Sequence, residues 1–273
     1  MTWLAATYAI FFWWFSTGAI LYVVSRAERE GRDGYMSAVV MAVPVLFLGC
    51  VGIVASLEST GLKGAYMGFT SALLVWGWFE MAFLAGIITG PNSYPTPSET
   101  HGWERFLRAW GAIAYSEMAL VFSAIMITLL SLGASNQIAL WTFMVLFFAR
   151  IFAKLNLYFG VPNINDEFLP RPVRHLTTHF RRAPMNAFFP VSVTLLTLAL
   201  ACWIERALAM PAGSGAETGF VLLAALTALA LFEHWMMILP LPDAALWRWL
   251  LPSPKTEKYD TKTAATTAPT RGL

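Results

Sequence analysis

The sequence contains few charged residues, few histidines and few cysteines. Asp, Glu, Lys and Arg make up 12% of its 273 residues, about half the share found in soluble domains, whereas 58% of the residues are hydrophobic. This balance excludes a soluble globular domain, and we expect no nucleic-acid partner. Cys50 and Cys202 each lie in an apolar stretch, so neither a disulfide framework nor a cysteine metal site is indicated. Both cysteines are predicted to be small core side chains.

A basic leader and an internal repeat are also missing. The chain begins Met1-Thr2-Trp3, and the apolar run that follows is too long for the core of a cleaved signal, so we expect it to remain as a membrane helix. Without a repeat, a transporter built from inverted repeats is not favoured.

Long apolar runs dominate what is present. About 20 apolar residues cross the hydrocarbon core of a bilayer as a helix. Because the runs are uninterrupted rather than alternating, they indicate helices and not barrel strands. The sequence therefore predicts an all-α, polytopic membrane protein whose principal partners are membrane lipids. Its seven spans are expected near residues 3–24, 36–57, 65–90, 109–133, 136–160, 187–210 and 217–240.

The distribution of Lys and Arg predicts the orientation of these helices. The connections after the first, third and fifth spans, together with the segment after the seventh, contain far more cations than the opposite connections, which hold only Lys63 and Arg206. By the positive-inside rule the amino terminus is periplasmic and the carboxyl terminus cytoplasmic. The cations on the predicted cytoplasmic side are Arg26, Arg29, Arg32, Arg105, Arg108, Arg171, Arg174, Arg181, Arg182, Arg248, Lys255, Lys258, Lys262 and Arg271.

Several ionisable residues nevertheless fall inside the predicted spans. At about 1.5 Å per residue they all lie roughly 9–15 Å from the cytoplasmic ends of their helices. Each would cost at least about 2.5 kcal/mol if it faced lipid, so we expect them to face one another. This predicted intramembrane cluster comprises Glu80, Glu117, Arg150, Lys154, Glu233 and His234. It has two interpretations: compensated ion pairs that fix helix packing, or a polar cavity open to the cytoplasm that holds a ligand, a metal or a proton path.

Polar residues in the adjoining connections are predicted to form a cytoplasmic mouth below this cluster. Thr96-Pro97-Ser98-Glu99 has the form of a capping box, which predicts a helix that begins near Pro97. After the fifth span, Asn and Asp side chains are expected to hold down an irregular loop that Pro162 and Pro170 keep from being helical. The predicted mouth comprises Glu99, His101, Glu104, Asn163, Asn165, Asp166 and Glu167.

A subset of these residues has the Glu and His composition that holds non-haem iron or manganese. This candidate metal set is Glu80, His101, Glu104, Glu117 and His234, although no Glu-x-x-His or His-x-x-x-His pattern lies within a span. A second pattern pairs His175 with His179 at helical spacing in "RPVRHLTTHFRR", as on a two-His metal face. It lacks the Glu of a His-Glu-x-x-His motif and is flanked by Arg. We interpret it as a basic interfacial helix.

The chain therefore divides into a seven-helix transmembrane domain over residues 1–252 and a tail over residues 253–273. Residues 241–252 contain Trp247, Arg248 and Trp249, which is typical of a segment in the headgroup region. The Lys-, Thr- and Ala-rich tail is predicted to be disordered and cytoplasmic.

Two blocks of the sequence resemble a known family. "FAKLNLYFGVPNINDEFLP" and "RHLTTHFRRAPMNAFFPVSVT", supported by "WGWFEMAFLAGIITGPN" and "FEHWMMILPLP", are similar to the PuhE-type photosynthetic complex assembly proteins of purple phototrophic bacteria. The likeness extends from about residue 3 to residue 250. It implies a gene that accompanies that of the reaction-centre H subunit, residence in the bacterial inner (intracytoplasmic) membrane, and reaction-centre or core antenna subunits as partners. It supplies no catalytic residues.

Two functions are compatible with these features. The first is an assembly factor for the reaction centre and core antenna that handles bacteriochlorophyll or its intermediates, with His234 or His101 as the neutral axial ligand of the chlorin magnesium. The second is a metal-dependent membrane oxidoreductase or hydroxylase that acts on a tetrapyrrole, a quinone or a lipid. Bacteriochlorophyll and a non-haem metal are accordingly the two candidate cofactors. A transporter or proton-conducting role is a further alternative.

Overall fold

The computed structural model describes residues 2–97, 99–164, 166 and 169–239. Within them the chain is helical, and the one isolated β-bridge joins Val161 to Arg182. The helices are α1 (Thr2–Ala27), α2 (Gly31–Met41), α3 (Val43–Ser56), α4 (Leu62–Leu84), α5 (Gly102–Leu130), α6 (Ile138–Phe159), the 3₁₀ helix η2 (Arg171–His179), α7 (Phe188–Ala209) and α8 (Gly215–Met236). The predicted interfacial segment and tail, residues 241–273, lie outside the described residues.

Seven helical segments of the described chain are long and apolar enough to cross a membrane, which confirms the predicted fold class. One of them, Gly31–Ser56, is formed by α2 and α3 together. The break between these two helices falls at Ala42, and Pro44 follows in the first turn of α3. Proline has no backbone N–H to continue the helical ladder, which explains the interruption of an otherwise continuous apolar span.

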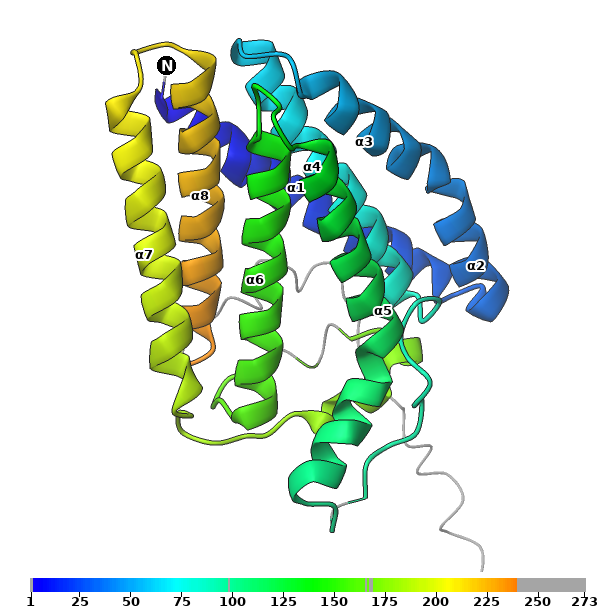
Figure 1. The fold of residues 1–273 in the computed structure, drawn as a ribbon. Helices are drawn as coiled ribbons and strands as arrows, with labels where there is room; N and C mark the ends of the chain where they lie inside the picture. Colours follow the sequence, from blue (N-terminus) through cyan, green and yellow to red (C-terminus); the bar gives the residue numbers. More distant parts are fainter. Residues whose placement is uncertain (1, 98, 165, 167–168, 240–273) are drawn as a thin grey trace, which may run out of the picture.

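Helix α4 lies at the centre of the bundle and packs against α3, α6, α8 and α1 (Figure 1). Small residues allow α4 to pack closely against α3. A Cβ atom on Gly52 of α3 would lie 2.1 Å from Ser71 Oγ of α4. On another side Phe69 and Leu73 of α4 pack with Leu222 and Leu226 of α8. Because α4 is enclosed on several sides, a charged side chain on it must be compensated by neighbouring helices.

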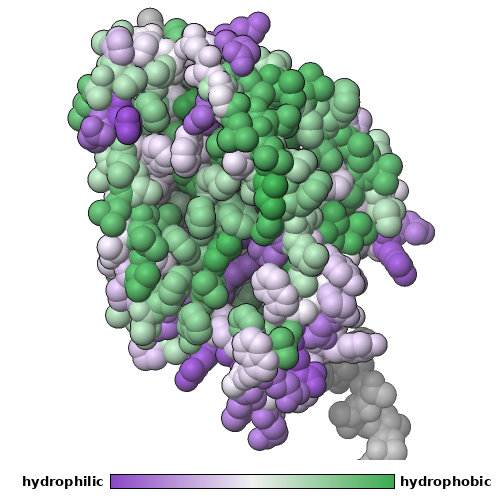
Figure 2. All heavy atoms as spheres, viewed as in Figure 1, coloured by the Kyte–Doolittle hydropathy of each residue, from purple (hydrophilic) through white to green (hydrophobic). Residues whose placement is uncertain are grey.

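The connections gather at two ends of the bundle. The α3–α4, α5–α6 and α7–α8 connections lie at one end, and the α4–α5 connection, η2 and the α6–α7 connection lie at the other (Figure 1). Apolar side chains cover most of the visible surface between the ends, whereas hydrophilic ones gather at them (Figure 2). This is the distribution that a bilayer requires of a membrane protein.

The connection between α4 and α5 differs from the prediction. Helix α4 ends at Leu84 rather than near residue 90, and Gly86 follows with a positive φ of 72°. The helix predicted to begin near Pro97 is wrong, because α5 begins at Gly102 with His101 at its N-cap. Thr96 does not cap a helix, since its N–H donates to Thr178 Oγ1 and its hydroxyl bonds with His179 Nδ1.

This connection also alters the shape of α5. The Ser116 N–H donates to the Thr89 carbonyl at 3.0 Å, and the Gly111 carbonyl accepts from the Asn92 N–H at 3.1 Å. These bonds join the α4–α5 connection to the backbone of α5, which bends visibly along its length (Figure 1). Gly90 permits the contact, because a Cβ atom there would lie 2.1 Å from the Gly111 carbonyl oxygen. The bend places Ser116 and Glu117 toward the interior of the bundle.

The prediction that both cysteines are core side chains is wrong. Cys50 on α3 and Cys202 on α7 are exposed on the outside of the bundle. In a bilayer the outer surface is as apolar as the core, so hydrophobicity alone did not distinguish the two locations.

Candidate functional site

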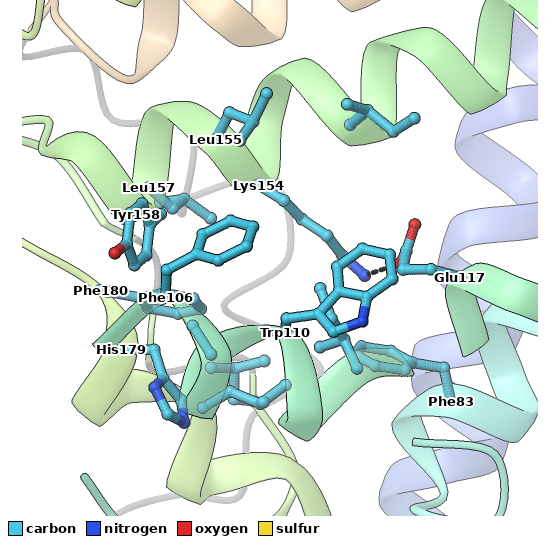
Figure 3. A pocket seen from close by; sticks show the side chains of 15 residues that line it. Phe83, Phe106, Trp110, Glu117, Lys154, Leu155, Leu157, Tyr158, His179 and Phe180 are labelled. Atoms are coloured by element: carbon cyan, nitrogen blue, oxygen red, sulfur yellow. Dashed lines mark hydrogen bonds and ion pairs between the residues drawn. The ribbon is translucent and has the colours of Figure 1, made fainter. Parts of the chain in front are cut away.

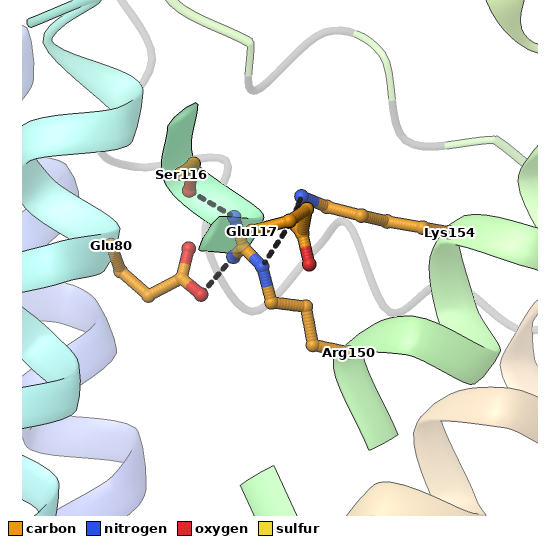
Figure 4. Close-up of polar contacts among 5 residues, drawn as sticks. All are labelled: Glu80, Ser116, Glu117, Arg150 and Lys154. Atoms are coloured by element: carbon orange, nitrogen blue, oxygen red, sulfur yellow. Dashed lines mark hydrogen bonds and ion pairs between the residues drawn. The ribbon is translucent and has the colours of Figure 1, made fainter. Parts of the chain in front are cut away.

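Arg150 and Lys154, one turn apart on α6, meet carboxylates from two other helices (Figure 4). Arg150 Nη1 donates to Glu80 Oε1 on α4, and Arg150 Nε lies 3.4 Å from Glu117 Oε1 on α5. Lys154 Nζ donates to the same Glu117 oxygen at 2.5 Å. The structure thus brings together Glu80, Glu117, Arg150 and Lys154, which we call the ionic cluster.

Ser116 and Phe83 complete the surroundings of the ionic cluster. Ser116 Oγ lies 3.4 Å from Arg150 Nη2. The Phe83 ring lies 4.7 Å from the Arg150 guanidinium carbon and 4.5 Å from Lys154 Nζ, so both cations contact one aromatic ring. Such contacts are worth about 2 kcal/mol where water is excluded.

The ionic cluster is withdrawn from the surface. Relative side-chain exposure is 7% for Glu117 and 10% for Arg150. Removing such charges from water costs several kcal/mol each, and only close pairing in a medium of low polarity offsets that cost. Two carboxylates face two cations, so the ionic cluster is neutral as a unit. It can fix the mutual positions of α4, α5 and α6.

The other two residues of the predicted intramembrane cluster, Glu233 and His234, lie on α8. Glu233 and His234 line a cavity of about 160 Å³ together with Glu80 and Arg150. His234 is buried and its Nδ1 lies 2.7 Å from the Ala230 carbonyl, which fixes Nδ1 as the protonated nitrogen in the neutral ring. Its Nε2 has no hydrogen-bond partner within the described part of the chain. This cavity therefore adjoins the ionic cluster on the side of α8.

The predicted mouth is only partly assembled. Glu99 and His101 are exposed, and Glu104 pairs with Arg108 at 2.9 Å on the outer surface of α5. Asn163 donates from Nδ2 to the Met236 and Leu239 carbonyls, which fastens the loop after α6 to the end of α8. Asp166 pairs with Arg182 at 2.9 Å. Asn165 and Glu167 lie outside the described residues.

The candidate metal set does not converge in the structure. Glu80, His101, Glu104, Glu117 and His234 are all described, yet no group of three or more His, Cys, Asp or Glu side chains that could hold a metal ion occurs among the described residues. Glu80 and Glu117 instead share Arg150, while Glu104 faces Arg108.

A second cavity, of about 330 Å³, lies beside the ionic cluster between α5, α6 and η2 (Figure 3). We call it the aromatic pocket. Phe83, Phe106, Trp110, Tyr158 and Phe180 form much of its wall, and its volume is in the range typical of small-molecule sites. Polar side chains reach it from two places: Glu117 and Lys154 of the ionic cluster, and His179 at the end of η2.

His179 was not among the predicted site residues. In a 3₁₀ helix with three residues per turn, His175 and His179 do not share a face, so their spacing of four does not form a two-His metal face. Burial lowers the pKa of His179 to about 4, with further lowering from His175 and Arg105. Burial also lowers the pKa of His175. The His179 ring is therefore neutral at neutral pH.

Arg105 fixes η2 against α6. Its guanidinium donates to the Tyr158 carbonyl at 3.0 Å and to the His179 carbonyl at 2.8 Å, and it lies 4.1 Å from the centre of the Tyr158 ring. In the sequence Arg105 was read only as one of the cations that set orientation. In the structure Arg105 also holds one wall of the aromatic pocket in place.

The fold and the site define a multi-pass α-helical membrane protein with a buried ionic cluster beside an aromatic pocket. The chain belongs to the family described as "Protein of unknown function (DUF3623)", whose model matches residues 1–258. It is 51% identical over 251 residues to a Rhodobacter capsulatus protein described as "Uncharacterized 30.4 kDa protein in puhA 5'region". That similarity covers 92% of this chain and 91% of the relative. No solved structure matches the chain.

The first prediction from this site concerns Arg150. Arg150→Met removes the cation that Glu80 and Glu117 share and leaves buried negative charge uncompensated. We expect the free energy of unfolding, measured by denaturant titration in mixed micelles, to fall by about 3–5 kcal/mol. The matched control is Arg108→Met, which removes an exposed ion pair on α5 and should cost less than about 1 kcal/mol. Equal small losses would show that the buried pairs do not stabilise the bundle.

A second prediction concerns pH. Because the pKa of His179 is about 4 in the folded protein and near 6.5 when unfolded, the unfolded chain binds more protons between these values. Stability is therefore lost as pH falls from 6.5 toward 4. Between pH 7.5 and pH 5 we expect the free energy of unfolding to drop by about 2 kcal/mol more in the wild type than in His179→Gln. Parallel pH profiles would contradict this assignment.

Proposed function

We propose that this protein is an assembly factor for the photosynthetic reaction centre and core antenna, located in the inner (intracytoplasmic) membrane of a purple phototrophic bacterium. The observation that carries the proposal is the nearly full-length similarity to a protein encoded in the 5' region of puhA. The sequence resemblance described above implies the same genetic setting, beside the gene of the reaction-centre H subunit.

The surface of the bundle supports a role in contacting other membrane helices. Only 11% of the most apolar window of the first span and 17% of that of the second are buried within the chain. Large side chains such as Phe11, Phe15 and Phe47 are exposed there. Lipid covers such faces in the free protein, and they are also the surface against which reaction-centre or antenna helices can pack.

The cavities limit how a pigment could be handled. An engineered cavity of about 150 Å³ holds a single benzene ring, so neither the aromatic pocket nor the cavity beside His234 encloses a whole chlorin. His234 is buried beside the smaller cavity and His101 is exposed, so only His101 of the two predicted axial ligands is accessible from outside the bundle. Bacteriochlorophyll or its intermediates would therefore be held on an open face of the bundle, where lipid otherwise lies.

The enzymatic alternative has less support. A metal-dependent oxidoreductase or hydroxylase needs three or more ligands around one point, and the described His, Cys, Asp and Glu side chains do not provide such a group. Elemental analysis of the purified protein decides this directly. Near-stoichiometric iron or manganese without pigment or antenna subunits would favour the enzyme over the assembly factor.

The proposed orientation places the end of the bundle that contains η2 in the cytoplasm. In a variant that lacks Cys50 and Cys202, Ala212→Cys lies in the α7–α8 connection and Arg174→Cys lies in η2. A membrane-impermeant maleimide added to spheroplasts should label position 212 and not position 174, because the basic end stays inside. Labelling of position 174 and not of position 212 would show that the orientation is the opposite of the one proposed.

The function itself is tested by gene replacement. We expect deletion of the relative's gene in Rhodobacter capsulatus to lower the near-infrared absorbance of reaction centre and core antenna in its membranes. Expression of this chain should restore that absorbance. Glu117→Gln should restore less than the wild type, because loss of this carboxylate leaves Lys154 without its partner in the ionic cluster.

The matched control for this experiment is Arg108→Ala, which changes a charge on the same helix outside the ionic cluster and should restore the complexes fully. Immunoblots must show equal amounts of each variant in the membrane. Unchanged absorbance in the deletion strain would refute an assembly role.

A further inference from the structure

The aromatic pocket combines flat apolar walls with a hydrogen-bond donor, Lys154 Nζ, that the described residues do not fully use. Lys154 Nζ donates one hydrogen bond to Glu117, and an ammonium group has three N–H donors. Trp110 and Phe106 of α5 line the aromatic pocket together with Lys154 of α6 (Figure 3). A ligand in this space could stack on the rings while it accepts a hydrogen bond from Lys154.

His179 forms part of the opposite edge of the aromatic pocket. Its side chain is 4% exposed, its Nδ1 lies 3.0 Å from Thr96 Oγ1, and its Nε2 has no hydrogen-bond partner among the described residues. The Nε2 atom is shielded from contact with water-sized molecules, so it does not face the open space of the aromatic pocket. The polar contact available to a ligand therefore lies at the Lys154 end of an otherwise apolar space.

The charge of the ionic cluster limits the ligand. Glu80 and Glu117 already balance Arg150 and Lys154 through the observed pairs. A ligand carboxylate beside Lys154 would add a third negative charge in a medium of low polarity, where an uncompensated charge is strongly disfavoured. A neutral acceptor, such as a carbonyl oxygen, can accept from Lys154 without disturbing this balance.

The volume of the aromatic pocket limits the ligand further. At about 330 Å³ it has roughly twice the room of an engineered cavity that holds benzene. It therefore accommodates one substituted six-membered ring with the start of an aliphatic chain. A whole tetrapyrrole is too large, although one edge of such a molecule could enter.

We propose that the aromatic pocket binds a neutral, flat ring that bears carbonyl oxygens, with Lys154 donating to one carbonyl and the aromatic walls enclosing the ring. Two sources in a photosynthetic membrane have this chemistry: the head group of a lipid-soluble quinone and the carbonyl-bearing edge of a bacteriochlorin. The choice of these two sources rests on the proposed function, whereas the site itself does not depend on which complex the protein serves.

The test uses the full-length protein in lipid nanodiscs and measures quenching of tryptophan fluorescence by a benzoquinone with a ten-carbon tail. Trp110 lines the aromatic pocket, so saturable quenching should be present in the wild type and reduced in Trp110→Phe. Ala109→Phe fills the aromatic pocket without touching the ionic cluster and should raise Kd at least about tenfold. Leu107→Phe, on the exposed face of the same helix, is the matched control and should leave Kd unchanged.

Two further comparisons identify the chemistry of the ligand. An alkylbenzene of the same size without carbonyls should bind more weakly than the quinone, and Lys154→Met should abolish that difference. If bacteriochlorophyllide competes with the quinone in the wild type but not in Ala109→Phe, the ligand is assigned to a tetrapyrrole. If bacteriochlorophyllide does not compete while the quinone binds tightly, the ligand is assigned to a quinone. Equal affinity for the quinone in the wild type and in Ala109→Phe, with both proteins folded by thermal melting, would overturn the proposal. So would the absence of saturable quenching by either compound.

Discussion

The bond between Arg150 and two carboxylates from other helices is the contact on which the interior of this protein depends. Arg150 is 10% exposed, and its guanidinium meets Glu80 of α4 and Glu117 of α5. A guanidinium remains charged in proteins, so it cannot avoid the cost of burial by losing its proton. Its planar array of donors instead contacts both carboxylates at once. The positive charge of Lys154 makes the ionic cluster neutral. Three helices are thereby fixed relative to one another in a region where apolar packing alone has little directional preference.

The position of Glu117 in turn depends on the connection between α4 and α5. Residues Thr89 and Asn92 bond to the backbone of α5 and bend it, and Gly90 allows the necessary approach. The same connection then reaches η2, where Thr96 bonds with His179 and Thr178. The ionic cluster, the bent helix and η2 therefore enclose one space, the aromatic pocket. Its apolar walls and its polar edge arise from the same set of contacts.

Much of this could be predicted from the sequence, because a charge inside an apolar span must find a partner. That rule identified Glu80, Glu117, Arg150 and Lys154, and the four-residue spacing on α6 placed the two cations on one face. Phe83 could have been added, since it lies three residues after Glu80 on the same helix. The length and composition of the apolar runs were sufficient for the seven helices.

The segments outside the spans could not be predicted in the same way. The Thr96-Pro97-Ser98-Glu99 pattern is a local signal, and tertiary bonds from Thr96 to η2 overrode it. Helical spacing suggested that His175 and His179 share a face, but η2 is a 3₁₀ helix, in which they do not. Whether a cysteine faces the core or the lipid was also undetermined, because both surroundings are apolar.

The coupling between Arg150 and Glu80 is the most direct test of this account. The free energies of unfolding of Glu80→Gln, Arg150→Met and the double variant, compared with the wild type in a double-mutant cycle, give that coupling energy. If the buried pair holds α4 to α6, the double variant should be more stable than the sum of the two single losses implies, by about 2 kcal/mol or more. Additive losses would mean that the two charges do not interact in the folded protein, and the account would be wrong.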